Sequence, residues 1–299
     1  MHGLVMLDAN NQPLRHAIIW CDQRTAAEVD EMNRVVGREK LMEITANPAL
    51  TGWTAAKILW VRNNEPHIYE QCKHILLPKD YLRLVLTNEY ATEVSDASGM
   101  QLLDVKNRCW SDELLKLLDI DKDLLGTVYE SCEVTGKLTE DMADTLGLCP
   151  GTIVVGGAGD NAAAAVGTGV VTDGKAFTTI GTSGVVFAHT SSMAMDSLGR
   201  VHTCCAAVPN SWHVMGVTQG AGLSLKWFRD NFCDAEKQTA LLMGKDEYFL
   251  MDQEAANVPV GANRLLYLPY LMGERTPHLD PNARGVFFGL SAMHSKRDM

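Results

Sequence analysis

One carboxylate in the sequence occupies a position suited to chemistry. Asp160 lies in the stretch GGAGDNAAAAVGTG, residues 156–169, which follows the hydrophobic run at residues 152–155. The pattern predicts a buried strand, a glycine turn and then a helix of small residues that starts near Asp160. A carboxylate fixed by such a turn could act as the general base that takes the proton of an attacking hydroxyl. The amide of Asn161 beside it could donate and accept hydrogen bonds.

Two other roles for this carboxylate follow from the same residues. A carboxylate at a helix N-terminus can simply cap the helix by accepting hydrogen bonds from its free amides. Gly157, Gly159 and Gly167 also loosely follow the G-x-G-x-x-G pattern of dinucleotide-binding loops. That match fails in detail, because the third glycine is misplaced and Asp160 would bring negative charge to a pyrophosphate. The residues alone therefore leave a helix cap and a general base open.

Two glycine turns further along the chain could hold phosphate groups. Gly181–Gly184 (GTSG) offers backbone amides and two hydroxyls between predicted strands, and it could equally be an ordinary hairpin turn. Gly220–Gly222 opens a predicted helix over residues 223–231, and its glycines could instead serve close packing of that helix on a sheet. Both turns follow Asp160, and together they favour a phosphate site. Residues 273–277 (GERTP) are predicted to form an exposed polar loop.

The composition argues against several classes of function. The 299-residue chain has a formal net charge of −11 and no basic stripe, which disfavours a nucleic-acid or anionic-membrane partner. No apolar run reaches about 18 residues, so we expect no membrane-spanning segment. The eight cysteines include no C-x-x-C pair and no Cys/His quartet, so no zinc site is expected. The first residues do not resemble a secretory leader, and we expect reduced thiols and a cytoplasmic location.

The hydrophobic patterns predict strands and helices in two successive α/β layers. The predicted strands lie at residues 4–8, 17–20, 152–155, 176–180, 185–189, 201–207 and 212–217. Helices are expected at residues 25–36, from a capping Thr54 onward, over much of residues 110–148, and at residues 223–231. The small-residue stretch at residues 167–174 is typical of a hinge or a domain edge.

Taken together and in order, these residues resemble the FGGY family of carbohydrate kinases, and within it the xylulokinases. Met1-His2-Gly3 is similar to the sugar-contacting motif of that group, and residues 156–161 resemble the loop that carries the catalytic base. Other stretches that resemble family motifs span the whole chain: Trp20-x-Asp22-x-Arg24, Gly52-x-Thr54-x-x-Lys57, residues 77–83 (LPKDYLR), residues 95–99 (SDASG), residues 181–184, residues 273–277 and residues 285–290 (GVFFGL).

The resemblance implies a fold of two actin-like, ribonuclease H-like α/β domains, of which this chain would hold an incomplete part. Residues 1–170 would form most of the first domain, which binds the sugar and carries the base. Residues 171–299 would form the start of the second domain, on the nucleotide side. The glycine-rich stretch at residues 167–174 would then mark the boundary between them.

The activity implied is ATP-dependent phosphorylation of D-xylulose at its 5-hydroxyl. Asp160 would take the hydroxyl proton as the catalytic base. His2, the backbone of Met1 and the side chain of Asn161 would hold the sugar together with Asp160. The partner would be a small-molecule sugar, and a homodimer is one assembly that the resemblance allows.

The same resemblance implies a nucleotide site in the second half of the chain. Gly181, Thr182, Gly222 and Lys226 would lie near the bound nucleotide. Magnesium would bridge the phosphates of ATP, as in other phosphoryl transfers. No residue of the chain is assigned as a magnesium ligand.

Two alternatives stay open at the level of the sequence. The sugar could be ribulose, gluconate, glycerol or a tetritol, because only Met1-His2-Gly3 favours xylulose. The chain could also bind a sugar without catalysis, as a regulatory or inactive fragment. A phosphate-transfer assay with a panel of sugars separates these possibilities.

The isolated chain provides a first prediction. The resemblance implies a D-x-G-T phosphate loop before Met1 and a glycine-rich adenine site after Met299. Phosphoryl transfer depends on positioning and charge stabilisation, so the γ-phosphoryl group must be held in line with the sugar hydroxyl. We therefore expect purified chain to release no ADP in response to xylulose in a coupled assay. Xylulose-dependent ATP consumption that Asp160→Asn abolishes would contradict this expectation.

Overall fold

The computed structural model describes residues 1–278, 280 and 282–299, and its chain divides into two units. The first unit comprises residues 1–177 and 187–215, and the second comprises residues 178–186 and 216–299. The division predicted from the sequence at residue 170 stays a prediction. Among the described residues, no helix is long and apolar enough to cross a membrane.

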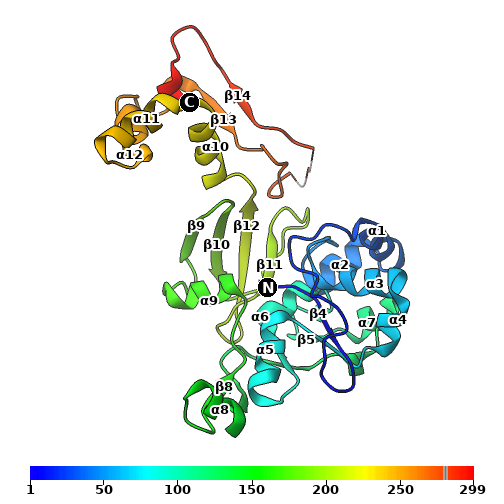
Figure 1. The fold of residues 1–299 in the computed structure, drawn as a ribbon. Helices are drawn as coiled ribbons and strands as arrows, with labels where there is room; N and C mark the ends of the chain where they lie inside the picture. The colour runs from blue at the N-terminus through cyan, green and yellow to red at the C-terminus, as the bar shows by residue number, and fades with distance from the viewer. Residues whose placement is uncertain (279, 281) are drawn as a thin grey trace. The chain divides into compact units, whose positions relative to one another are not determined.

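Short strands join distant parts of the sequence within the first unit (Figure 1). The pairs are β1 (Val5–Leu7) with β2 (His74–Leu76), β3 (Ala91–Glu93) with β6 (Thr127–Tyr129), β4 (Leu103–Asp104) with β5 (Cys109–Trp110), and β7 (Val134–Lys137) with β8 (Ile153–Val155). The β3–β6 pair is parallel and the other three are antiparallel. The first pair joins the start of the chain to residues 74–76, and the second joins residues 91–93 to residues 127–129.

Nine α-helices lie among the described residues of the first unit. They are α1 (Ala26–Val35), α2 (Arg38–Thr45), α3 (Thr54–Asn64), α4 (Pro66–Gln71), α5 (Pro78–Thr87), α6 (Val94–Ala97), α7 (Asp112–Leu118), α8 (Glu140–Leu146) and α9 (Asp160–Gly167). The predicted helix at residues 25–36 corresponds to α1. The predicted start at Thr54 is right to within a residue, but Thr54 is inside α3 and the N-cap is Trp53, without a side-chain cap bond.

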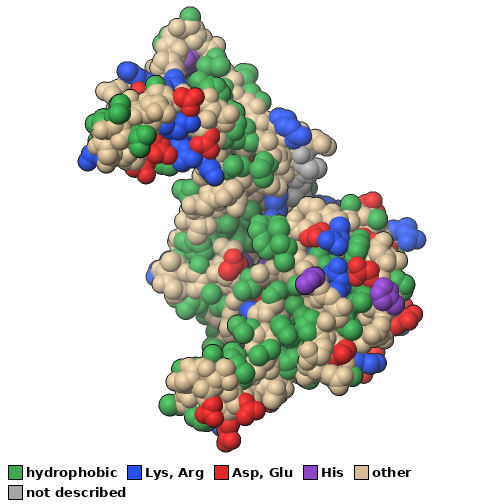
Figure 2. All heavy atoms as spheres, in the orientation of Figure 1, with side chains coloured by type: hydrophobic (Ala, Val, Ile, Leu, Met, Phe, Trp, Pro, Cys, Tyr) green, Lys and Arg blue, Asp and Glu red, His purple; other side chains and the backbone are tan. Residues whose placement is uncertain are grey.

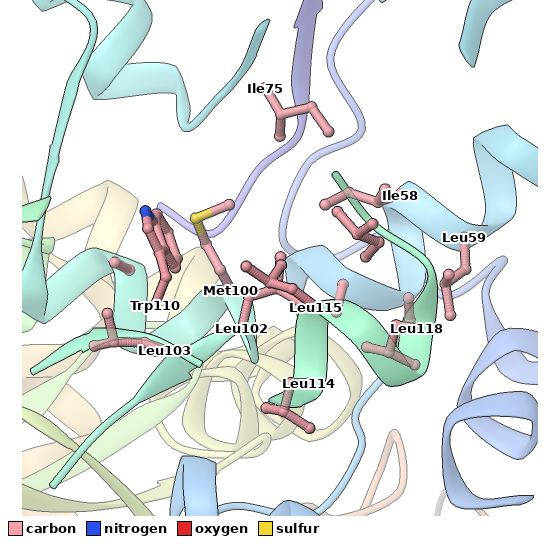
Figure 3. Packing of buried hydrophobic residues seen from close by; sticks show 14 of the residues in the cluster. Ile58, Leu59, Ile75, Met100, Leu102, Leu103, Trp110, Leu114, Leu115 and Leu118 are labelled. Atoms are coloured by element: carbon pink, nitrogen blue, oxygen red, sulfur yellow. The ribbon is translucent and has the colours of Figure 1, made fainter. Parts of the chain in front are cut away.

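The hydrophobic core of the first unit gathers around α3 and α7 (Figure 3). Ile58 and Leu59 of α3 are fully buried, and Leu114 and Leu118 of α7 are buried as well. Helix α1 packs against both α3 and α7. Figure 3 shows Ile75 of β2 among the labelled side chains of the same cluster. The N-terminal part of α3 lies inside the unit, since residues 54–59 and Val61 are all buried.

Two strand predictions in the first unit need correction. Residues 17–20 do not form a strand: Ile18 makes an isolated bridge to Leu4, while Ile19 and Trp20 are each 52% exposed. The strand β8 forms as predicted but is not buried, because Ile153 is 61% exposed. It forms a hairpin with β7 around the small helix α8, and Figure 2 shows acidic side chains on that helix.

The segment from residue 110 to residue 148 is less helical than predicted. Helices α7 and α8 form, but the strands β6 and β7 lie between them. The two strands contain Val128, Val134 and Thr135, whose β-branched side chains favour extended backbone. Leu114 of α7 is buried, whereas Leu146 of α8 is 49% exposed.

A four-stranded sheet includes residues of both units, and its strands agree closely with the sequence pattern. Its order is β11-β12-β10-β9, formed by β9 (Ala176–Ile180), β10 (Gly184–Thr190), β11 (His202–Cys205) and β12 (Trp212–Thr218). The second unit continues with α10 (Gly222–Phe232), α11 (Asp234–Met243), α12 (Glu247–Ala255), β13 (Leu266–Leu268) and β14 (Val286–Phe288). Strands β13 and β14 pair antiparallel, with the rings of Tyr267 and Phe287 stacked at 4.7 Å.

The burial pattern gives a prediction about stability. Leu59 is 0% exposed, and we expect Leu59→Ala to lower the free energy of unfolding by about 2–5 kcal/mol, because the substitution leaves a cavity. The control is Leu82→Ala on α5, where the leucine is 59% exposed and the loss should stay under about 0.5 kcal/mol. Denaturant unfolding measures both. Equal losses for the two variants would refute the core as described.

Candidate functional site

Two side chains of α3 donate hydrogen bonds to the backbone carbonyl of His2. The His2 carbonyl accepts a 3.1 Å bond from Thr54 Oγ1 and a 2.8 Å bond from Lys57 Nζ. Lys57 is fully buried and donates a second bond, of 2.6 Å, to the carbonyl of Gly52. His2 has a φ of +52°, a conformation that a non-glycine residue adopts only when its surroundings impose it. The motif Gly52-x-Thr54-x-x-Lys57 thus holds the residue predicted to contact the sugar.

A single oxygen of Asp96 holds both the backbone and the ring of His2. The backbone amide of His2 donates to Asp96 Oδ1 over 3.1 Å, and His2 Nδ1 lies 2.8 Å from the same oxygen. The ring packs on the bare backbone of Gly99, where an added Cβ would come within 2.0 Å of Nδ1. Trp53 lies beside it, with ring centroids 5.9 Å apart. The orientation of the His2 side chain is therefore fixed by its surroundings.

Glu93 fixes the position of Asp96 through a hydrogen bond to its backbone amide. Its carboxylate caps α6 by accepting bonds of 2.7 Å and 2.9 Å from the amides of Ser95 and Asp96. It also accepts bonds from the hydroxyls of Ser95 and Ser131, at 3.0 Å and 2.8 Å. All of this lies in the interior, because the Glu93 side chain is 0% exposed. A buried carboxylate is tolerated only with such a set of donors.

The ammonium group of Lys79 lies among the carboxylates of three acids in this region. Lys79 Nζ lies 2.7 Å from Asp80, 3.2 Å from Glu93 and 3.9 Å from Asp96 Oδ2. Burial lowers the pKa of Lys79, but the three carboxylates outweigh this and raise it. Burial raises the pKa of Asp96, but His2 and the charge of Lys79 outweigh this and lower it to about 2. Asp96 is therefore an ionised acceptor at any working pH.

The turn before Asp160 rests on the same structure. The Gly159 amide donates a 2.9 Å bond to Ser95 Oγ, and an added Cβ at Gly159 would lie 3.8 Å from the Asp96 Cα. Asp160 is the first residue of α9, exposed, and Asn161 Nδ2 donates to its Oδ1 over 3.4 Å. The N-cap position belongs to Gly159 instead. His2 thus contacts Asp96, and the turn that carries Asp160 bonds the neighbouring residue, Ser95.

In the second unit the two predicted phosphate turns are bonded to each other. The amide of Gly222 donates to the Gly181 carbonyl over 2.8 Å, and the amides of Ala221 and Leu223 donate to the Thr182 carbonyl over 3.1 Å and 3.2 Å. A Cβ on Gly222 would come within 2.5 Å of the Gly181 carbonyl oxygen, so close packing accounts for this glycine. The amides at the start of α10 are engaged by the turn. The exposed Thr182 hydroxyl is a remaining donor for a ligand.

Two further polar features of the second unit are Lys226 and the loop at residues 273–277. Lys226 is exposed on α10, one helical turn after Gly222 and therefore on the same face. The predicted exposed loop is wrong for Glu274, which is 3% exposed. Glu274 accepts bonds from the Thr218 hydroxyl at 2.6 Å and from the Gln219 amide at 3.1 Å. It therefore fixes the end of β12, just before α10.

An apolar cavity of about 350 Å³ also lies beside α10 in the second unit. Aromatic side chains contribute much of its lining, among them Trp227, Phe228, Tyr267 and Phe287. Of the residues predicted to lie near the nucleotide, neither Thr182 nor Lys226 lines it. Among the described residues there is also no group of three His, Cys, Asp or Glu side chains that could hold a metal ion. The described residues therefore offer no cage for magnesium.

Lys57 gives a pH-dependent prediction. Burial lowers the pKa of Lys57 to about 8 from its ordinary 10.5, against the opposing charges of Asp22, Cys21 and Asp96. Between these two values the unfolded state binds the proton more tightly than the folded state, so stability should rise with pH. Relative to Lys57→Met, the wild-type free energy of unfolding should gain up to about 3 kcal/mol between about pH 8 and about pH 10.5. Denaturant unfolding across this range checks it, and a constant difference between the two proteins would contradict it.

Comparison with known proteins agrees along the whole chain. Residues 1–167 match the N-terminal domain, and residues 176–299 the C-terminal domain, of the FGGY family of carbohydrate kinases. The xylulose kinase of Escherichia coli (strain K12) is 40% identical over 299 residues, which are 100% of this chain and 59% of that protein. The gluconokinase of Bacillus subtilis (strain 168) is 31% identical over 299 residues, 100% of this chain and 58% of that protein.

A solved structure extends the likeness to the fold. The crystal structure of a "xyloylose kinase" from Brucella ovis matches with a TM-score of 0.88 and 37% identity, covering 100% of this chain and 58% of that one. The predicted α/β sugar-kinase fold is thereby confirmed, over little more than half the length of these relatives. On both the sequence and the fold, the chain belongs to the FGGY family of carbohydrate kinases.

Proposed function

We propose that this protein takes part in the ATP-dependent phosphorylation of D-xylulose at its 5-hydroxyl, with Asp160 as the general base. The observation that carries the proposal is the arrangement at α6, where Asp96 contacts His2 and Ser95 accepts a hydrogen bond from the turn that presents Asp160. A sugar-holding group and an exposed carboxylate thus belong to one rigid arrangement of the first unit. The 40% identity to a xylulose kinase supports the choice of sugar.

On the sugar side, each residue has a chemical role that its surroundings permit. The exposed Asp160 carboxylate accepts the proton of the attacking hydroxyl, which is a poor nucleophile while it keeps that proton. Asn161, bonded to Asp160, orients that carboxylate and offers its amide to a neighbouring sugar hydroxyl. His2, held by Asp96, and the half-buried backbone of Met1 keep the sugar in register. Positioning of this kind is a large part of catalysis in phosphoryl transfer.

On the nucleotide side, the roles fall to the second unit. Thr182 provides an exposed hydroxyl and Lys226 an exposed ammonium, which suit the oxygens of a phosphate group. Gly181 and Gly222 provide the close backbone approach that joins the turn to α10. ATP would supply the phosphoryl group itself.

A second sugar is a candidate because of the 31% identity to a gluconokinase. The two sugars differ in chemistry, since gluconate carries a carboxylate and xylulose is neutral. Calorimetric titration of the purified chain with D-xylulose and with gluconate distinguishes them. Tighter binding of xylulose supports the proposal, and tighter binding of gluconate would replace its substrate.

Asp160 gives the test of mechanism. The chain is placed in E. coli xylulose kinase in place of the 299 residues that it matches, so that the assay uses an enzyme of full length. Asp160→Asn keeps the shape of the side chain and removes its basicity, and we expect kcat to fall by about 10²–10⁴ with little change in sugar affinity.

The matched control is Asp144→Asn, which changes an exposed acid on α8 and should leave turnover unchanged. Transfer of radiolabelled phosphate from ATP to xylulose measures both variants. Near-normal turnover of the Asp160→Asn enzyme would show that Asp160 is not the base.

A further inference from the structure

The contact between Asp96 and His2 can determine which nitrogen of the His2 ring carries the proton. One oxygen, Asp96 Oδ1, lies 3.1 Å from the His2 amide and 2.8 Å from the ring atom Nδ1. The backbone amide donates a hydrogen bond to this oxygen, and the ring nitrogen lies in ion-pair contact with the same oxygen, so the contact restrains the orientation of the ring. Asp96 itself is 0% exposed and is held in turn by Glu93, which accepts from the Asp96 amide.

The charge on Asp96 determines which ring nitrogen carries the proton. An ionised carboxylate is an acceptor only, so the atom 2.8 Å from it has to donate. The Nδ1 of His2 therefore carries hydrogen, and in the neutral imidazole Nε2 is left with a free lone pair. Lys79, with Nζ 3.9 Å from Asp96 Oδ2, stabilises the ionised carboxylate from the other side.

The packing at Gly99 limits the movement of the ring, and the contact with Asp96 distinguishes the two orientations that a flip would exchange. Gly99 leaves no room on one face, since even a methyl group there would come within 2.3 Å of Cε1. Nδ1 is buried, although the His2 side chain as a whole is 24% exposed. With Nδ1 facing Asp96, Nε2 is the ring nitrogen that remains for a ligand. A ring flip would bring a carbon to face the carboxylate and leave Nδ1 without its acceptor.

We propose that Asp96 is a positioning residue that fixes His2 as the Nδ1–H tautomer, so that Nε2 accepts a hydrogen bond from a hydroxyl group of the bound sugar. Asp96 does not itself touch the sugar, because both of its oxygens are buried among protein atoms. The selection of a hydroxyl donor rests on the sugar-kinase function proposed above, whereas the tautomer does not depend on it. The site would thus discriminate for a ligand that donates at this position.

Nitrogen NMR tests the tautomer without any sugar. The 299-residue chain is labelled with ¹⁵N-histidine and studied about two pH units above the ordinary imidazole pKa of about 6.5, where neutral rings show their tautomers. The His2 signals are those lost in His2→Gln. We expect a protonated Nδ1 and an unprotonated Nε2 in the wild type. A protonated Nε2 in the wild type would overturn the proposal, and this measurement needs no variant of Asp96.

Asp96→Asn extends the same test. An amide can donate as well as accept, so it no longer dictates the ring proton, and the His2 signals should move toward the other tautomer. Asp112→Asn, which removes an exposed charge at the start of α7, should leave them in place. An unchanged His2 tautomer in a folded Asp96→Asn chain would refute the proposal that Asp96 fixes the tautomer.

Sugar binding tests whether Asp96 acts through His2. Calorimetric titration with D-xylulose should give about tenfold weaker binding for Asp96→Asn, the loss expected for one charged hydrogen bond. His2→Ala should also weaken binding, and the double variant should bind no more weakly than His2→Ala alone, because two residues in one contact are not additive. Fully additive losses would show that Asp96 acts on its own and overturn the proposal. If the wild-type chain binds no xylulose, the proposed substrate fails, while the NMR result still decides the tautomer.

Discussion

The buried carboxylate of Glu93 is the constraint on which the candidate sugar site depends. Helix α6 has four residues, too few to be stable alone, and the Glu93 side chain caps it from inside the unit. The same carboxylate bonds Ser131 and the Ser95 hydroxyl, and that hydroxyl accepts from Gly159. Removing one of these hydrogen-bond donors would leave the Glu93 charge poorly compensated in the low-dielectric interior. The positions of Asp96 and of the turn before Asp160 thus follow from one acid.

Local pattern was enough to predict several of the elements. Helix α1, the start of α3 and the strands β9 to β12 all follow the predicted residues to within a few positions. Prediction fails where tertiary contacts override the local pattern. The strand expected at residues 17–20 has apolar side chains that face solvent, and β8 is apolar although it lies in an exposed hairpin. Its burial could not be inferred from the hydrophobicity of Ile153 alone.

The site shows the same division between motif and contact. Asp160 and His2 could be singled out from the sequence, and the structure relates them through the neighbouring residues Ser95 and Asp96. The residues His2 and Asp96 are 94 positions apart, and no spacing rule reports a contact at that separation. Asp96 and Lys57 both lie in segments that resemble family motifs, which was the available signal, but their shared attachment to His2 depends on the folded chain. Glu274 is a similar case, because a polar loop sequence gives no sign of its burial.

Gly99 and His2 compete for one volume, and this has an evolutionary consequence. Any side chain at position 99 would begin 2.0 Å from the ring of His2, which Asp96 prevents from moving aside. A lineage cannot therefore acquire a larger residue at position 99 while it keeps the histidine. The order of change is set by sterics: position 2 must shrink first, and only then does position 99 become free to vary. The two positions are therefore coupled, because a substitution at one is tolerated only after a change at the other. A shift to a different sugar that discards His2 would permit side chains at position 99 that the histidine now excludes.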